Sequence, residues 1–266
     1  MAEITATLVK ALREATGQGM MECKKALGET GGDIDAAKDL LRKKGLLTAQ
    51  KKAARTTSEG LIGLSANSER TEAAMVEVRC ETDFCARNQV FRDMVSAVTK
   101  MASVAPAGQV EPTDAIRDAV QAALSKIGEN MGYARGIKIA APRVGTYLHH
   151  NQKVGVIIGV NGNIDDETLT GLCMHIAFAD PMAVSPKDID PAVIEKEREI
   201  ALAQAVRQGK NEQVAEKMVI GKINKFLADN ALLEQVYVRD ETKKVKDLLG
   251  GAAVTAFARF AVGSAG

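Results

Sequence analysis

The chain has 266 residues, and its 35 Lys and Arg nearly balance its 34 Asp and Glu. A net charge this close to zero creates no long-range field that would attract nucleic acid or an anionic membrane, so neither is expected as the main ligand. No apolar run reaches the roughly 20 residues of a membrane-spanning helix, and the first residues show no secretory or import leader, so we expect a cytoplasmic protein. The four cysteines are too scattered for a disulfide framework and are expected to be reduced thiols.

Residues 1–47 predict a domain of three short helices. Apolar residues recur there at helical spacing in three stretches, separated by glycine-containing breaks at 16–19 and 30–32. Asp33 is expected to cap the start of the third helix, and Gly45 is expected to end it. A segment of this length can build only a small core. The domain is therefore expected to dock onto another surface.

Residues 48–58 are expected to form a basic linker. The stretch from Arg42 to Arg55 contains six basic residues and no acidic one. Such a charge run indicates either a solvated helical connection or a surface for RNA or an acidic partner. In the second interpretation, Lys51 and Lys52 would carry much of the binding.

Residues 59–142 predict a first α+β subdomain. Strands at 61–65 and 74–80 flank a polar turn and should pair as a hairpin. Two amphipathic helices follow, one that begins near Arg87 and one at 113–127 that ends at a glycine.

Residues 143–186 and 231–266 predict a second α+β subdomain, interrupted at 187–230 by two amphipathic helices that form an antiparallel hairpin. Asp165 is expected to cap the helix that follows the apolar strand 154–160. The first subdomain is expected to end with a strand at 136–141, and a polar turn is expected at 147–152. The two hairpin helices are expected to be separated by a break at 208–210, and short strands are expected at 236–238 and 256–262. The alternation of strand pairs and helices predicts an α+β fold with two related halves.

The junction at 79–88 stands out because it joins an apolar strand to a helix and carries a large ring. In the strand, Glu77 and Arg79 alternate with apolar residues, which predicts one buried and one solvent-facing side. Only 3% of the chain is aromatic, yet Phe84 follows Asp83 directly at this corner. The residues alone allow Phe84 to be a core ring or a surface group, and Asp83 to be a helix N-cap.

The usual signatures of nucleotide, metal and acyl-transfer chemistry are missing from the sequence. There is no G-x-x-x-x-G-K-S/T loop, and Gly155, Gly159 and Gly162 have the wrong spacing for a dinucleotide site. Cys173 and His175 are two residues apart in an expected helix, so they point to different faces and do not indicate zinc. We therefore expect no cofactor, no direct nucleotide binding and no enzyme activity. An enzyme using His149 or Cys85 remains as an alternative to be tested.

Three groups of residues together resemble one family, bacterial elongation factor Ts, the nucleotide exchange factor of the GTPase elongation factor Tu. The first is the N-terminal run 9–27, and the second is 80–88, which reads Cys-Glu-Thr-Asp-Phe-Cys-Ala-Arg-Asn. The third comprises the short stretches 126–130, 147–149 and 174–177. The resemblance covers nearly the whole chain, although Cys85 stands where the family usually has valine and Arg79 where it more often has asparagine.

The resemblance implies a fold and a set of site residues. The fold would be a three-helix ubiquitin-associated-like (UBA-like) domain, a core of two α+β subdomains with small antiparallel sheets, and an inserted antiparallel helical hairpin. Thr82, Asp83 and Phe84 would push between helices of the GTPase near its Mg²⁺ site. The supporting partner contacts would come from Ile127, His149, Leu12, Met20 and Met21.

Each supporting residue also has a simpler interpretation from the sequence. Ile127 could serve only the core, His149 could be an ordinary surface histidine, and Met20 and Met21 could be packing residues. The sequence also leaves open whether the chain forms a homodimer, or a two-to-two complex with elongation factor Tu, through the core or the hairpin.

Overall fold

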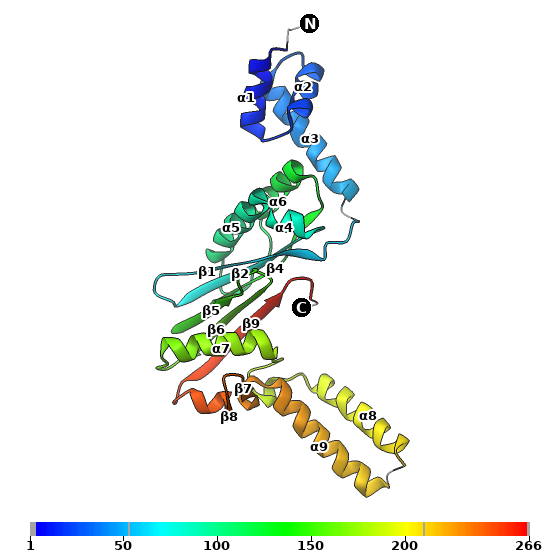
Figure 1. Ribbon diagram of the computed structural model, residues 1–266, viewed down its shortest axis with the longest axis vertical. Coiled ribbons are helices and arrows are strands. Elements are labelled where there is room, and N and C mark those ends of the chain that lie inside the picture. Colours follow the sequence, from blue (N-terminus) through cyan, green and yellow to red (C-terminus); the bar gives the residue numbers. More distant parts are fainter. Residues whose placement is uncertain (1–3, 53, 210, 265–266) are drawn as a thin grey trace.

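The computed structural model describes residues 4–52, 54–209 and 211–264, and the side chains of 46–51 lie outside this description. Two antiparallel sheets face each other at the centre of the molecule, and helices cover the outer face of each sheet (Figure 1). A three-helix module extends from one end of this sandwich, and a pair of long helices extends from the other (Figure 1). The mixture of helices with small antiparallel sheets confirms the predicted α+β class.

The N-terminal module consists of α1 (Ala6–Thr16), α2 (Met20–Glu29) and α3 (Ile34–Lys52) around a small apolar core. The Asp33 carboxylate accepts hydrogen bonds from two backbone N–H groups of the first turn of α3, at 2.9 and 3.0 Å, which confirms the predicted cap.

The predicted helix end at Gly45 is wrong, because α3 continues to Lys52. Gly45 faces Ser125 of α6 (Asp114–Ile127), and a Cβ atom on Gly45 would lie only 2.6 Å from the Ser125 hydroxyl oxygen. Its carbonyl oxygen accepts a hydrogen bond of 3.2 Å from the side chain of Gln121, also on α6. The glycine therefore allows two helices to approach closely, and the first part of the expected linker is helical.

The first sheet has the strand order β1-β2-β4-β3, with every neighbouring pair antiparallel. Its strands are β1 (Glu59–Ala66), β2 (Glu72–Cys80), β3 (Gly108–Gln109) and β4 (Met131–Ala140). The predicted β1–β2 hairpin is confirmed. Helices α5 (Gln89–Ser103) and α6 cover the outer face of this sheet.

The prediction that one side of β2 faces solvent is wrong. One face of β2 packs against α5 and α6, and the other packs against the second sheet. Glu77 is consequently fully buried. Alternation of polar and apolar residues indicates a half-buried strand only where the polar side meets water.

The second sheet has the order β5-β6-β9 and is also antiparallel. Its strands are β5 (Arg143–Leu148), β6 (Val154–Asn161) and β9 (Ala253–Ala261). Tyr147 and Leu148, expected in a turn, instead end β5. Helix α7 (Asp166–Ala179) covers the outer face, and Asp165 caps it as predicted, its side chain accepting from the backbone N–H of Thr168 at 2.7 Å.

Two long helices interrupt the second half of the chain, α8 (Pro191–Arg207) and α9 (Glu212–Asn230), and they pack on each other through a narrow apolar seam. They extend away from the sandwich (Figure 1). Short elements fill the rest of this half: η1 (Pro186–Asp188), η2 (Leu232–Glu234), β7 (Val236–Tyr237), β8 (Asp240–Lys244) and η3 (Val245–Leu248). None of the helices in the described ranges is long and apolar enough to cross a bilayer.

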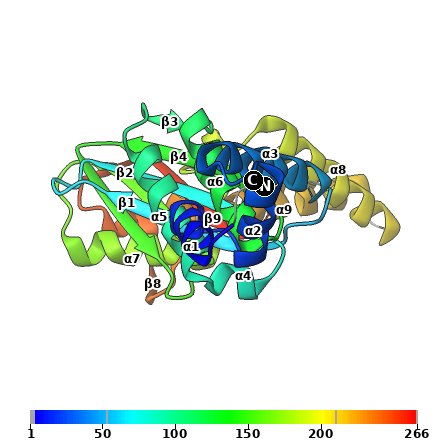
Figure 2. The ribbon, with the colours of Figure 1, turned by 90° about the horizontal axis from the view of Figure 1, so that it is seen from above.

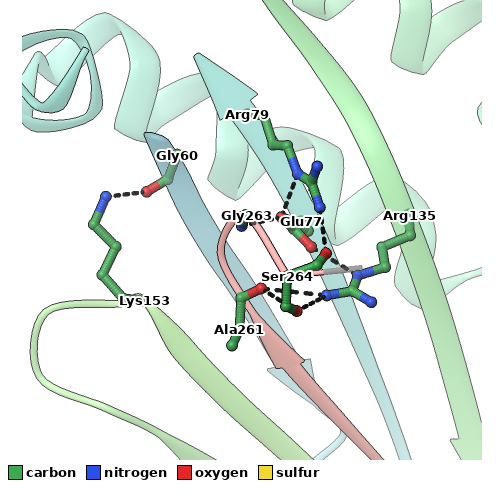
Figure 3. Close-up of polar contacts among 8 residues, drawn as sticks. All are labelled: Gly60, Glu77, Arg79, Arg135, Lys153, Ala261, Gly263 and Ser264. Carbon is green, nitrogen blue, oxygen red and sulfur yellow. Dashed lines mark hydrogen bonds and ion pairs between the residues drawn. The ribbon is translucent and has the colours of Figure 1, made fainter. Parts of the chain in front are cut away.

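A buried carboxylate joins the two sheets near one end of the sandwich (Figure 3). Glu77 pairs with Arg79 at 2.6 Å and with Arg135 at 2.7 Å, and it accepts the backbone N–H of Gly263 at 3.0 Å. The two guanidinium groups in turn donate to Ser264, at 2.8 Å to its carbonyl and 3.0 Å to its hydroxyl oxygen. The C-terminal segment of the second sheet is thereby held against the first sheet.

Candidate functional site

The corner after β2 is a short helix, α4 (Asp83–Arg87), whose cap is Thr82. The hydroxyl oxygen of Thr82 accepts a hydrogen bond from the backbone N–H of Cys85 at 3.1 Å. Asp83 is therefore the first residue of the helix, and the interpretation of Asp83 as its N-cap is wrong. The Asp83 carboxylate pairs with Arg87 at 3.0 Å on the exposed side of α4.

Phe84 projects from this helix into solvent. Its side chain is 79% exposed, so the interpretation of Phe84 as a core ring is wrong. Its neighbours Cys85 and Ala86 are buried in the core between the first sheet and its helices, which anchors the other face of α4. A large exposed ring on an anchored turn is typical of an interface residue.

Two carboxylates join the corner to the loop between α6 and β4, one from each segment. Glu129 accepts hydrogen bonds from the backbone N–H and the hydroxyl group of Thr82, at 3.2 and 2.9 Å. Glu81 accepts from the backbone N–H of Asn130, and this hydrogen bond, helped by the nearby Arg55, lowers the pKa of Glu81 below its usual value. In the sequence, Glu129 lies within the family-like stretch 126–130, and nothing there indicates this contact.

Ile127 and His149 lie at the same end of the sandwich as the corner. Ile127 ends α6, two residues before Glu129, and is half-buried against the first core. His149 lies in the β5–β6 turn, half-buried, with its Nδ1 2.7 Å from the Tyr147 hydroxyl oxygen.

This turn is fixed to the start of β1, which pairs with the end of β2. Lys153 donates to the Glu59 carboxylate at 2.6 Å. It also donates to the Gly60 carbonyl oxygen at 2.8 Å (Figure 3). Since Glu59 lies opposite Cys80 in the β1–β2 register, the turn and the corner are held at one end of the sheets. The structure thus brings together three of the predicted parts of the site: the corner of Thr82, Asp83 and Phe84, the end of α6, and the His149 turn.

The N-terminal residues divide into two kinds. Leu12 is completely buried in the core of the three-helix module, so its predicted role as a direct partner contact is wrong; it holds α1 in place. Met20 and Met21, at the start of α2, are 52% and 75% exposed and are free for contact, contrary to the packing interpretation. In the view from above, α2 and α4 lie near each other in projection (Figure 2), while Figure 1 shows them separated along the long axis.

The thiols at the corner are poorly suited to nucleophilic chemistry. The neighbouring Cys85 and burial raise the pKa of Cys80 far above its usual value, and the Cys85 side chain is itself buried. Among the described residues, no group of three or more His, Cys, Asp or Glu side chains is arranged to hold a metal ion. Both thiols are therefore poorly placed for the nucleophilic role considered for Cys85.

The basic segment is partly occupied by contacts within the chain. Lys44 pairs with Glu29 at 2.8 Å, Lys52 donates to the carbonyl oxygen of Gly128, and Arg55 pairs with Glu81 at 3.4 Å. The side chain of Lys51 lies outside the described residues. These contacts favour the interpretation of a structural connection over that of an RNA-binding surface.

Comparison with known proteins gives the family. A sequence model described as Elongation factor TS matches residues 81–264. The chain belongs to the elongation factor Ts family. Its relatives include the elongation factor Ts proteins of Teredinibacter turnerae, 44% identical over 98% of this chain and 91% of the relative, and of Hahella chejuensis, 43% identical over 99% and 93%. That of Clostridium acetobutylicum is 38% identical over 97% of this chain and 92% of its own length. The chain is thus a member of a family of elongation factors of protein biosynthesis.

Proposed function

We propose that this chain is a guanine-nucleotide exchange factor that binds elongation factor Tu and promotes GDP release, so that GTP can reload during translation elongation. Family membership supports the partner and the reaction. The observation that carries the mechanism is Phe84, 79% exposed on a corner whose other side is anchored in the core. In this mechanism Phe84 enters a gap between helices of the GTPase, and Asp83 bonds groups that the displaced helix leaves exposed.

A small displacement is enough to release nucleotide. Mg²⁺ requires nearly ideal octahedral geometry and is held by a few protein groups together with water and phosphate oxygens. Moving one supporting helix of the GTPase therefore weakens the binding of the ion and of the phosphates together. The ring must be rigid to push, and the short anchored helix provides this rigidity.

Linkage explains why such a factor needs no bond-making groups. If its binding weakens GDP binding to the GTPase by a given ratio, GDP weakens factor binding by the same ratio. Exchange then proceeds through a transient complex of GTPase, nucleotide and factor, which GTP binding resolves. The factor acts without catalysing a chemical step.

The other predicted contacts have supporting roles in this proposal. The three-helix module, proposed to be UBA-like, docks on the nucleotide-binding domain through Met20 and Met21. Ile127 and His149 contact the GTPase beside the corner. Mass measurement of the purified complex would decide between a one-to-one and a two-to-two assembly.

The test uses elongation factor Tu loaded with a fluorescent GDP, mixed rapidly with the chain and excess unlabelled GDP. The chain should accelerate loss of the dye, and Phe84→Ala should remove most of the acceleration without loss of folding. Val104→Ala is the matched control, since Val104 is also a largely exposed apolar residue, 83% exposed, after the far end of α5. No acceleration at micromolar factor would contradict the function, and an unaffected Phe84→Ala would contradict the wedge mechanism.

A further inference from the structure

We propose that Glu129 is a positioning residue, which fixes the direction in which Phe84 projects. This inference rests on the proposed function of the corner. Glu129 does not reach the exposed face of α4; it acts through Thr82, the cap of that helix.

The connection runs through one hydroxyl group. Thr82 donates its hydroxyl and its backbone N–H to the Glu129 carboxylate, and its hydroxyl oxygen accepts the backbone N–H of Cys85. Because the hydroxyl proton is committed to Glu129, a lone pair of the same oxygen faces α4 and orients its first turn. Because both bonds go to one carboxylate, at 3.2 and 2.9 Å, they restrict the position and the orientation of Thr82 together.

A second carboxylate, on the corner itself, binds the loop between α6 and β4. Glu81, in the corner, accepts the backbone N–H of Asn130, while Glu129, in the loop, accepts that of Thr82. Each segment thus supplies a carboxylate to the other. Asn130 also donates its side-chain amide to the carbonyl oxygen of Arg55 at 2.8 Å, which ties the connection from the N-terminal module to the same point.

Helix α4 needs such support because it has only five residues. A helix this short is not stable through its own backbone hydrogen bonds. Burial of Cys85 and Ala86 keeps it on the core, and the two hydrogen bonds from Thr82 to Glu129 add a polar attachment at its start. Phe84 can displace part of a partner only if α4 keeps its own position. The bonds from Thr82 to Glu129 connect α4 to the loop between α6 and β4.

The first measurement separates positioning from binding. Glu129→Gln keeps the size of the side chain but replaces one acceptor oxygen by an NH₂ group, so it cannot accept both Thr82 hydrogens in the same way. We expect the maximal rate of GDP release at saturating factor to fall about ten-fold, because misplacement of a working group lowers rates steeply, while the half-saturating concentration changes less than about two-fold. Glu111→Gln, an exposed residue of the same subdomain, is the control. Thr82→Ser, which keeps the hydroxyl group, should retain the maximal rate of GDP release, and Thr82→Val, which removes it, should lower that rate.

A double-mutant cycle tests whether Glu129 acts through Phe84. In the Phe84→Ala background, Glu129→Gln should cause no further loss of rate, because there is no ring left to position. An equal further loss in that background would overturn the inference and indicate a general structural effect. If Phe84→Ala itself left exchange unchanged, the proposed wedge would fail, so the two failures are distinguishable.

A reporter independent of exchange is available because the chain has no tryptophan. In a Phe84→Trp variant, time-resolved fluorescence anisotropy measures the motion of the side chain at this position in the free protein. Adding Glu129→Gln should increase the amplitude of the fast local motion, whereas adding Glu111→Gln should not. An unchanged anisotropy decay with Glu129→Gln would overturn the inference.

Discussion

Asp83 and Arg87 form an ion pair of 3.0 Å along the solvent side of α4, one turn apart, with the carboxylate at the start of the helix and the guanidinium at its end. This is the arrangement that the helix dipole favours. Both side chains are substantially exposed, so the pair contributes little to stability. Its exposure leaves the carboxylate available to exchange Arg87 for a group of the proposed GTPase partner.

The pair provides a test of what Asp83 does. If the carboxylate only stabilises α4, Asp83→Asn and Arg87→Gln should have equal effects on GDP release. We expect Asp83→Asn to slow release and Arg87→Gln to have little effect, because Asp83 is proposed to bond the displaced helix of the partner. Each substitution should change the free energy of unfolding by no more than about 0.5 kcal/mol, as measured by urea denaturation.

Two phenylalanines seven residues apart should respond in opposite ways to truncation. Phe91 is fully buried in the first core, whereas Phe84 is 79% exposed. Phe91→Ala should cost about 3–5 kcal/mol of unfolding free energy, because it removes a large buried ring and leaves a cavity. Phe84→Ala should leave the unfolding transition nearly unchanged while it slows exchange. Comparable losses of stability in the two variants would show that Phe84 packs into the fold.

The parts of the fold that sequence predicts well are those set by local chemistry. The caps Asp33 and Asp165 and the β1–β2 hairpin depend on residues a few positions apart, and the structure confirms them. The errors depend on elements distant in sequence. Gly45 was expected to end a helix because its contact with Ser125, 80 positions along the chain, cannot be read locally. Glu77 was expected in water because the second sheet that covers it lies far away in sequence.

The candidate site shows the same division. The corner and its ring were predicted from the sequence, since a strand ends and a helix begins there. Whether the ring faces the core or solvent was not predictable from the residues, because it depends on which side of α4 the first sheet and α5 occupy. Glu129 lies 47 residues from Thr82, so the contact that supports the corner had no local signal.

The buried carboxylate of Glu77 should be one of the most sensitive positions for stability. It pairs with Arg79 and Arg135 and accepts the backbone N–H of Gly263. Removing one member of a buried ion pair leaves uncompensated charge, so Glu77→Ala should cost about 3–5 kcal/mol in urea denaturation. Asp114→Asn, which breaks the exposed pair with Arg117, is the control and should cost no more than about 0.5 kcal/mol. Equal small losses in both variants would contradict a structural role for Glu77.

His175 predicts a pH dependence of stability. His175 belongs to α7 and its ring is buried. Its Nε2 lies 2.9 Å from the side-chain oxygen of Gln235, and its Nδ1 accepts the backbone N–H of Val238 at 3.3 Å. The Nδ1 contact requires the neutral ring with its proton on Nε2. Burial lowers the pKa of His175 below its usual 6.5, partly opposed by the hydrogen bond with Gln235. Protonation would break the bond to Val238 and place a charge in the second core.

The sign follows from which state binds the proton. Below pH 6.5 the unfolded chain takes up a proton at His175 before the folded chain does, so folding is opposed. The contribution of His175 is thus fully present above pH 6.5 and is lost as pH falls toward the lowered folded value, with a slope of at most about 1.4 kcal/mol per pH unit. The free energy of unfolding of the wild type and of His175→Phe can be measured by urea denaturation between pH 5 and 8. The decrease in this free energy at low pH that comes from His175 should appear only in the wild type. Leu172→Ala, which removes a buried side chain of the same helix, should be less stable but keep the slope. A wild-type slope in His175→Phe would assign the pH dependence to other groups.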